Sequence, residues 1–516
     1  MKDWGTGYVG DVAYSAGYYH DQAPAHLWFI CLMNGFEPRP VDKPFNYLEL
    51  GCGLGLTVNI LAATNPNGNF VGVDFNPAHI AEAEAVADAA GLENVSFYES
   101  SFEEVLSETC MDMPDFDVVT LHGVYSWVSP DDRLRIVEIL RRKLKPGGIV
   151  YLSYNGMPGW SGGEPVQRLL YEYGQLTTER SDLQFERALT FVRSLRDADV
   201  AFFKDNRFLE SILEIHGKGR LPYLTHEYIN RNWQPLYHFD VARALADAKL
   251  QFVGSSHALD NFLDLNHSAE RQKLLNQASA ADVRETIKDF FVPRLLRKDV
   301  FMRGARRLSL SRQEQLIGPM PLALVIPSGA ATLDIKAPIG EIQVSADAFS
   351  PVLDALAEGT RNMKELLALS ACKEKNGAKA VEIAGVLVGS GQAEPALSEP
   401  SQASRKAVRR LNLALAQRAA TKPIGDAHAL ASAEIGGAVP ASGLELRVYE
   451  GLQTGVQEEA AALAEHVWQP LRAQSERLLK DGRVLETEEE NLALLREDLG
   501  RVLAQSFPLW RRIGCL

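Results

Sequence analysis

The chain has 516 residues, of which 46% are hydrophobic and 23% charged, the composition of an ordinary soluble globular protein. This length exceeds what one hydrophobic core supports, so two or three domains are expected. The formal net charge of −14 argues against a general nucleic-acid binder, which needs basic residues to neutralise phosphates, and favours cationic partners.

The cysteines and the start of the chain indicate a cytoplasmic location. The five cysteines are scattered, with no spacing typical of a metal or redox pair, which indicates a reducing compartment. The N-terminus lacks the basic-then-apolar pattern of a secretory signal. No run reaches the roughly 20 apolar residues of a membrane span. We therefore expect a cytoplasmic protein without a membrane span.

The first forty residues are rich in aromatic side chains and glycine. They include Trp4, Tyr8, Tyr14, Tyr18 and Tyr19. One interpretation is an arm that packs on the surface of a sheet. The other is a lid over a bound ligand, because aromatic rings hold cations by their π faces. In the second case Tyr18 and Tyr19 are candidate substrate-binding residues.

The stretch from Asn46 to Gly55 predicts a nucleotide-type site. It is a short apolar strand with an acid, Glu49, followed by glycines at 51, 53 and 55. Glycines turn the chain without Cβ atoms, so that backbone can lie directly against a ligand. The predicted helix from 56 to 64 then presents its free N–H groups to an anionic group.

A second strand, 69–74, ends in Asp74, whose carboxylate is placed to accept both ribose hydroxyls of a nucleoside. Phe75 could lie against the adenine. Asn76 and Pro77 are a sound helix start, and Gly91 is placed to end that helix.

Three more strands are predicted, at 95–99, 117–121 and 149–154, each followed by polar and aromatic residues. Five βα units in regular order predict an α/β fold with a doubly wound, Rossmann-like parallel sheet. The ligand crevice of such a sheet lies at the carboxyl ends of its strands.

The motifs resemble those of class I S-adenosylmethionine-dependent methyltransferases that carry a methyltransferase regulatory domain. The resemblance rests on Glu49-Leu-Gly-Cys-Gly53, His122-Gly-Val-Tyr-Ser-Trp127, Ser153-Tyr-Asn155, Tyr223-Leu-Thr-His-Glu-Tyr228 and Arg297-Lys-Asp-Val-Phe-Met-Arg-Gly304. The best-known similar proteins are rickettsial lysine methyltransferases that modify outer-membrane proteins.

The resemblance implies S-adenosyl-L-methionine as cofactor and S-adenosyl-L-homocysteine as product. The cofactor-binding residues that it implies, together with the reading above, are Glu49, Gly51, Cys52, Gly53, Gly55, Asp74, Phe75, Ser101, Phe102 and His122. An acid often follows the third strand in this family and binds the adenine amino group. Here Ser101 stands at that place, so the contact is expected to be weaker or made by backbone.

A lysine acceptor must lose its proton, which costs about 4 kcal/mol at neutral pH. Tyr125, Tyr154 and His122 are therefore the candidate catalytic residues, and Trp127 and Trp160 could cage an alkylammonium group. Asn155 is a further candidate for substrate binding. For each aromatic residue the alternative is ordinary packing, and His122 could instead line the cofactor.

The predicted domains are a catalytic domain over 1–265, a helical middle or regulatory region over 266–320, and a mostly helical C-terminal domain over 321–516. A helical insertion at 161–220 is either a cap over the crevice or a plain spacer. Residues 340–396 resemble a winged-helix unit. The segment 280–315 is expected to be helical with a solvated basic face. No compact metal-ligand spacing is present, so no metal is expected.

The predicted function is N-methylation of lysine side chains of a protein or peptide, without nucleic acid as a partner. The alternatives are N- or O-methylation of a small molecule or peptide, and a non-catalytic regulatory protein that binds S-adenosylmethionine.

Overall fold

The computed structural model describes residues 7–12, 17–40, 42–109, 113–204, 206–369, 379–419, 427–480 and 482–516. Trp4 and Tyr14 of the predicted aromatic arm lie outside these residues. In the described part of the chain, no helix has the length and apolar character needed to cross a membrane.

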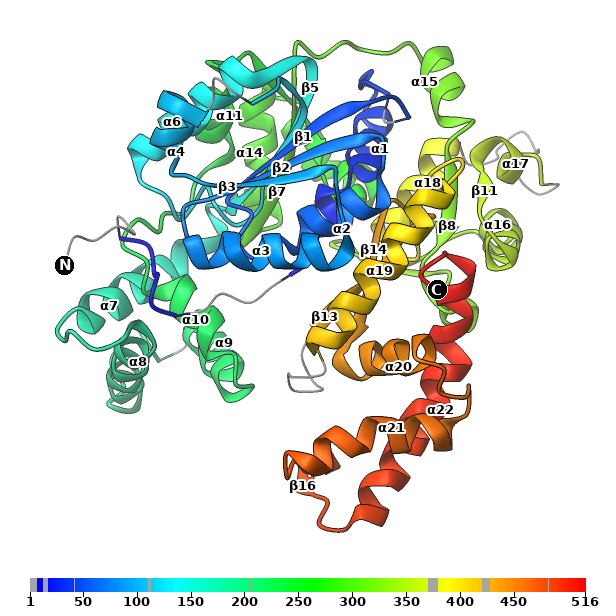
Figure 1. The fold of residues 1–516 in the computed structure, drawn as a ribbon. Helices are drawn as coiled ribbons and strands as arrows, with labels where there is room; N and C mark the ends of the chain where they lie inside the picture. The colour runs from blue at the N-terminus through cyan, green and yellow to red at the C-terminus, as the bar shows by residue number, and fades with distance from the viewer. Residues whose placement is uncertain are drawn as a thin grey trace.

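A seven-stranded sheet forms the centre of the fold, with strands in the order β3-β2-β1-β4-β5-β7-β6 (Figure 1). The strands are β1 (Phe45–Leu50), β2 (Gly68–Asp74), β3 (Val95–Glu99), β4 (Phe116–Leu121), β5 (Leu144–Asn155), β6 (Leu250–Ser255) and β7 (Leu296–Arg303). The first five strands run parallel, and β7 is antiparallel to both β5 and β6. The predicted doubly wound sheet is confirmed, with an added antiparallel strand.

Helices cover both faces of the sheet because its central strands are apolar on both sides. Tyr47 of β1 packs into the cluster formed with α1 (Pro24–Met33) and α2 (Leu56–Thr64). Leu48 and Leu50 point to the opposite face, where α6 (Pro130–Lys143) and α11 (His238–Ala246) lie. The side chains of one strand thus alternate between two separate cores.

Helix α3 (Pro77–Ala90) begins and ends as its sequence predicts. The Asn76 side chain accepts a hydrogen bond from the Ala78 N–H, and Pro77 occupies the first turn. Gly91 ends the helix in the left-handed conformation, with φ of 59°. This helix follows the carboxyl end of β2 and packs against α2 and β2.

The segment 280–315 differs from its prediction, because only part of it is helical. Helix α14 (Ala281–Phe291) and α15 (Leu310–Ile317) flank strand β7, which lies inside the sheet. The sheet therefore extends past the predicted boundary at residue 265, and the region 266–320 is not purely helical.

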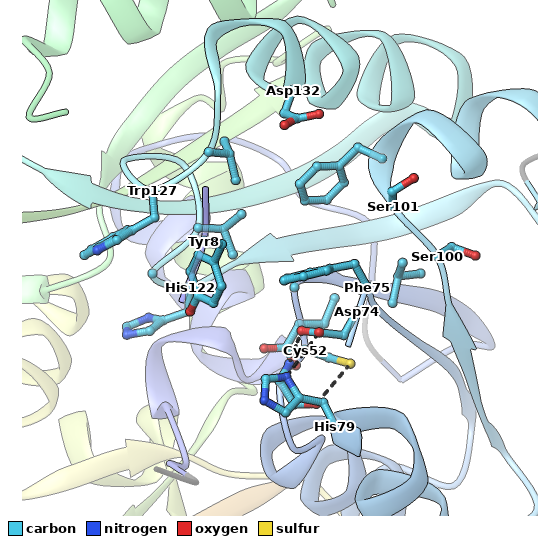
Figure 2. A pocket seen from close by; sticks show the side chains of 18 of the residues that line it. Tyr8, Cys52, Asp74, Phe75, His79, Ser100, Ser101, His122, Trp127 and Asp132 are labelled. Atoms are coloured by element: carbon cyan, nitrogen blue, oxygen red, sulfur yellow. Dashed lines mark hydrogen bonds and ion pairs between the residues drawn. The ribbon is translucent and has the colours of Figure 1, made fainter. Parts of the chain in front are cut away.

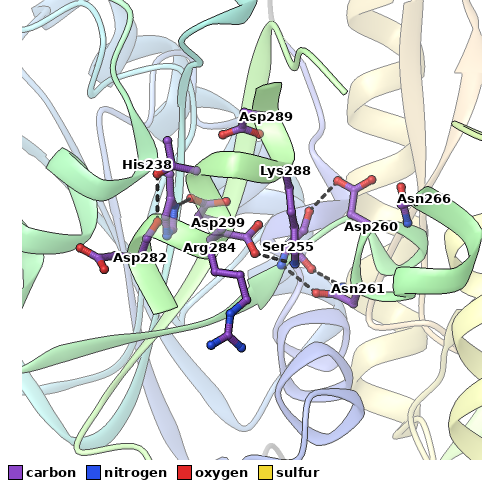
Figure 3. Close-up of polar contacts among 12 residues, drawn as sticks. His238, Ser255, Asp260, Asn261, Asn266, Asp282, Arg284, Lys288, Asp289 and Asp299 are labelled. Atoms are coloured by element: carbon purple, nitrogen blue, oxygen red, sulfur yellow. Dashed lines mark hydrogen bonds and ion pairs between the residues drawn. The ribbon is translucent and has the colours of Figure 1, made fainter. Parts of the chain in front are cut away.

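Arg297 explains this difference. Its guanidinium is buried, not solvated, and donates to Glu285 at 2.9 Å, to Asp289 at 2.7 Å and to Asp299 at 3.1 Å. Asp299 belongs to β7 and Asp289 to α14, and both appear among the polar side chains of Figure 3. A charged residue with three buried acidic partners fits the interior of a sheet, although its sequence pattern suggests a surface helix.

The insertion after β5 is helical, as predicted. It comprises α7 (Glu164–Gly174), α8 (Ser181–Asp197) and α9 (Arg207–Gly217), followed by α10 (Leu221–Tyr228). These helices share an apolar core of their own, which includes Trp160. They lie together to one side of the sheet (Figure 1).

The C-terminal part of the chain is mostly helical. A small sheet of β8 (Pro321–Leu324), β11 (Arg361–Asn362) and β12 (Ala393–Pro395) is accompanied by α16 (Ala346–Glu358), α17 (Met363–Leu367) and α18 (Ala380–Gly389). The elements that follow are α19 (Gln402–Ala419), β13 (Ala427–Ser432), β14 (Gly437–Ser442), α20 (Gly443–Gln453), α21 (Ala460–Ala473), β15 (Leu479–Lys480), β16 (Arg483–Val484) and α22 (Glu488–Arg512). Helix α19 packs against α2 and α3, where Val408 and Leu411 meet Ile60, Val86 and Ala90.

Candidate active site

A cavity of about 1130 Å³ lies at the carboxyl ends of β1 to β4 (Figure 2). Its walls come from the turns that follow these strands and from the N-terminal arm. The strand order reverses between β1 and β4, so this is the crevice where doubly wound sheets bind ligands.

The three glycines after β1 have distinct roles. All have positive φ, namely 74° at Gly51, 53° at Gly53 and 69° at Gly55. A Cβ at Gly51 would lie 2.5 Å from Val124, and one at Gly55 would lie 2.4 Å from Ala83, so close packing requires these glycines. A Cβ at Gly53 would meet no protein atom within 4 Å. The backbone of Gly53 therefore faces open cavity, where a ligand can approach it.

Glu49 presents a carboxylate oxygen that lacks a partner. Gln22 Nε2 donates to Glu49 Oε1 at 3.0 Å, whereas the buried Oε2 has no hydrogen-bond partner. Burial raises the pKa of Glu49 to about 8. A cationic donor group of a ligand would both satisfy Oε2 and favour the carboxylate form.

Asp74 is held in one orientation by its neighbours. Its carboxylate accepts the N–H of Gly53 at 2.9 Å and of Asn76 at 3.0 Å. His79 Nδ1 lies 3.1 Å from Asp74 Oδ1. These contacts fix the carboxylate at the tip of β2 beside the glycine turn.

Aromatic rings line the end of the cavity near β3. The ring of Tyr8 meets Phe75 edge-on, with the ring centroids 5.7 Å apart, and Phe102 also lines the cavity. The N–H and hydroxyl of Ser101 both donate to Glu104, at 2.7 and 2.8 Å, as the cap of the short helix α4 (Phe102–Glu104). Ser101 therefore lines the cavity with its hydrogen-bonding groups already used.

The opposite end of the cavity is built around His122. The ring of Tyr19 stacks on His122, with centroids 3.6 Å apart and an interplanar angle of 20°. His122 Nδ1 lies 2.8 Å from the hydroxyl of Tyr151. Burial lowers the pKa of His122 to about 3, so the imidazole is neutral. Trp127 completes this wall.

The structure brings most of the predicted site residues to this cavity. The predicted residues that line it are Tyr19, Glu49, Gly51, Cys52, Gly53, Asp74, Phe75, Ser101, Phe102, His122 and Trp127. Gly55 lies beneath it as the N-cap of α2. No described residue of the insertion 161–220 lines the cavity.

Tyr154 does not lie where its prediction placed it. It is fully buried on the opposite face of the sheet, and its hydroxyl donates to Asp299 Oδ2 at 2.6 Å. Asp299 in turn lies beside His238 (Figure 3). Strand alternation is the reason, since Tyr151 and Ser153 take the face that reaches the cavity. Tyr154 therefore lies outside the cavity wall, in the polar cluster around Asp299.

The other predicted residues outside the cavity wall are engaged in packing. Tyr125 is buried, with Arg133 positioned over its ring at 6.0 Å. Trp160 Nε1 donates to the Leu295 carbonyl at 2.8 Å, and Asn155 Nδ2 donates to Glu227 at 2.9 Å. Tyr18 packs beside the β13–β14 hairpin, where its hydroxyl lies against Gly437.

Several residues of the site were missed from the sequence. They are Tyr8, Gln22, His79 and Tyr151. The period of two along β5 could have indicated Tyr151, because it shares a face with Ser153. Tyr8 belongs to the aromatic arm, for which a lid is one interpretation, but it is not among the predicted site residues, and Gln22 carries no local signal because it meets Glu49 only through the folded arm.

Comparison with known proteins finds methyltransferase families along the part of the chain that forms the cavity. Residues 42–178 match a methyltransferase domain family, and residues 221–303 match a family described as a predicted methyltransferase regulatory domain. An uncharacterised protein of Synechocystis sp. is 34% identical over 99% of both chains. One from Rickettsia prowazekii is 28% identical over 50% of this chain and 47% of its own length.

The fold is shared with a solved structure along almost the whole chain. PKMT2 from Rickettsia typhi, in complex with AdoHcy, superimposes with a TM-score of 0.69, covering 97% of this chain and 100% of that one at 16% identity. The two family matches and the full-length relative show that the chain is an enzyme and belongs to the class I S-adenosylmethionine-dependent methyltransferases with a methyltransferase regulatory domain.

Proposed function

We propose that this enzyme N-methylates lysine side chains of a protein substrate. The observation that carries the proposal is the charge of the cavity wall. Six acidic side chains line it, those of Glu49, Asp74, Glu99, Glu103, Glu104 and Asp132, and all except Glu49 are carboxylates in the free enzyme; they face the single guanidinium of Arg135. Arg135 itself is paired with Glu103 and Asp132, each at 3.1 Å. Such a wall attracts a cationic amine and repels a carboxylate or phosphate acceptor.

The residues present fit the cofactor. The unpartnered Glu49 Oε2 suits its amino group, Asp74 suits the ribose hydroxyls, and the open space at Gly53 lets the backbone approach it. Phe75 and Phe102 are placed to hold the adenine ring. S-adenosylmethionine supplies an electrophilic methyl group on a sulfonium.

The wall around His122 supports an amine acceptor. Because His122 is neutral, it does not repel a lysine cation, and the ring faces of Tyr19 and Trp127 can hold that cation. Burial against these rings lowers the pKa of the amine, which aids loss of its proton. Tyr151 acts as a positioning residue, because its hydroxyl orients the His122 ring.

We place this reaction in a reducing cytoplasm. The described cysteines, Cys31, Cys52 and Cys515, are buried and form no disulfide, which supports that location.

The test is transfer of label from methyl-labelled S-adenosylmethionine into an extract that is then separated into protein and small molecules. We expect acid-stable and alkali-stable label on protein, located on lysine by mass spectrometry. Asp74→Asn should abolish transfer, whereas Asp88→Asn, on the exposed side of α3, should not.

Two results would contradict the proposal. Label confined to the small-molecule fraction would indicate a metabolite methyltransferase. Alkali-labile label on protein would indicate carboxylate O-methylation.

A further inference from the structure

Two imidazoles and two carboxylates meet where the N-terminal arm contacts the C-terminal part of the chain. His20 and Asp21 belong to the 3-10 helix η1 (His20–Gln22), His26 to α1, and Glu394 to β12. His20 Nδ1 lies 3.2 Å from Glu394 Oε1, and His26 Nδ1 lies 3.4 Å from Glu394 Oε2. The potential ligand atoms of His20, Asp21 and His26 all lie within 4.8 Å of one another.

These separations match a tetrahedral metal site. With metal–ligand bonds of about 2.0–2.1 Å, neighbouring ligand atoms in a tetrahedron are about 3.3 Å apart. The distances from His20 Nδ1 and His26 Nδ1 to the two oxygens of Glu394, 3.2 and 3.4 Å, are close to this length, and His20 Nε2 lies 3.8 Å from Asp21 Oδ2. A combination of imidazole and carboxylate ligands suits zinc and similar transition metals.

His26 is held in the orientation of a metal ligand. Its side chain is buried, and Nε2 lies 2.8 Å from the backbone carbonyl oxygen of Ser256, which can only accept a hydrogen bond. Nε2 therefore carries a proton, and Nδ1 faces Glu394. Nδ1 is buried without a hydrogen-bond partner. Metal-binding histidines are fixed in this way, by a carbonyl on the other ring nitrogen.

One cation also contacts the cluster. Lys298 Nζ lies 2.6 Å from Asp21 Oδ2. It holds the Asp21 carboxylate beside the two imidazoles and offsets part of the negative charge. A divalent ion is compatible with this arrangement, because two carboxylates lie beside the two imidazoles.

We propose that His20, His26 and Glu394, completed by Asp21, form a binding site for a divalent transition metal of the zinc type. The metal would tie residues 20–26 of the arm to β12. Tyr19, the residue before His20, stacks on His122 in the cavity. The site would therefore hold one wall of the active site against the C-terminal part of the chain.

The test uses the full-length protein without a histidine tag, stripped with a chelator and titrated with Zn²⁺ in a calorimeter. We expect one Zn²⁺ per chain and a higher melting temperature. Outer-shell changes at metal sites typically weaken affinity about 10–100-fold, so loss of a ligand in His20→Gln or Glu394→Gln should weaken it by about 100-fold or more. Co²⁺ should give the intense visible absorption of a four-coordinate site.

His466→Gln is the matched control. His466 also pairs with a carboxylate, that of Glu450. This variant should keep the affinity of the wild type. His20 is about half exposed, so its variant should fold without metal, which circular dichroism can verify.

Either of two results would overturn the proposal. Unchanged Zn²⁺ affinity in both His20→Gln and Glu394→Gln would place any bound metal elsewhere. No uptake of Zn²⁺ by the wild type would show that the cluster is an ion-paired contact between the arm and β12.

Discussion

Glu49 combines a buried carboxyl group with an oxygen that no protein donor satisfies. Burial raises its pKa from 4.5 to about 8, so the free enzyme holds a proton there at neutral pH. The cationic cofactor stabilises the carboxylate, and binding should therefore release up to about one proton. Calorimetry in buffers of different ionisation enthalpy measures this release. Glu49→Gln should abolish it, and a buffer-independent heat in the wild type would contradict the assignment.

The same group affects stability with a defined sign. Because the folded-state pKa lies above the unfolded-state value, folding favours the protonated form. The cofactor-free protein should lose stability from this group as the pH rises from about 4.5 through 8. The melting temperature should depend less on pH across this range for Glu49→Gln than for the wild type.

Loss of the hydroxyl should affect activity at Tyr151 and stability at Tyr154, the two tyrosines of β5. Tyr151→Phe frees the His122 ring, so kcat should fall about tenfold, a change of 1.4 kcal/mol in the barrier. Tyr154→Phe removes a donor from the buried Asp299, so unfolding should become easier by about 1–3 kcal/mol. Steady-state kinetics and denaturant unfolding of both variants provide the measurement. Strong loss of activity with normal stability in Tyr154→Phe would restore that residue to a catalytic role.

At the scale of single elements, β7 depends on one buried charge. Arg297 has three acidic partners. Burial alone would raise the pKa of Asp299, but the Arg297 guanidinium holds that pKa below its ordinary value. Arg297→Met should lower the free energy of unfolding by about 3–5 kcal/mol, because the buried Asp299 would lose its guanidinium partner while Glu285 and Asp289 keep only Lys288 and Arg294. Arg306→Met is the control, since Arg306 pairs with Glu37 while its side chain is 74% exposed. Equal stability of the two variants would contradict the importance of the network.

The elements also show what the sequence could and could not predict. Glu49, the glycines, Asp74 and the caps of α3 lie within βα units, where a few neighbouring residues determine the geometry. Strand β7 was missed because Arg297 looks like a surface residue until Glu285 and Asp289 fold over it. Tyr154 was misplaced because the motif gives the strand but not which face each tyrosine takes. Gln22 and Glu394 reach their partners only through long-range contacts.

At the scale of the whole molecule, α19 of the C-terminal part of the chain packs against α2 and α3, which cover the central sheet. Val408 of α19 is fully buried among residues of α2 and α3. A charge there cannot be paired, so Val408→Asp should lower the melting temperature of the whole enzyme in one cooperative transition. Lys406→Asp, on the exposed side of the same helix, should not. Two separate transitions in the wild type would show that the two parts unfold independently.

The arm that walls the cavity has consequences for synthesis on the ribosome. Its residues 19–26 lie against Lys298 of β7 and Glu394 of β12, although they are made first. A nascent chain that has not yet exposed these two later segments lacks two anchors of the arm, although Glu49 and His122 can already contact Gln22 and Tyr19. The glycine turn and Asp74 can fold early, whereas the wall formed by Tyr19 and Gln22 is fixed in place only when Lys298 and Glu394 contact the arm. Catalytic competence should therefore arise only after most of the chain has left the exit tunnel, so truncated products would not consume the cofactor.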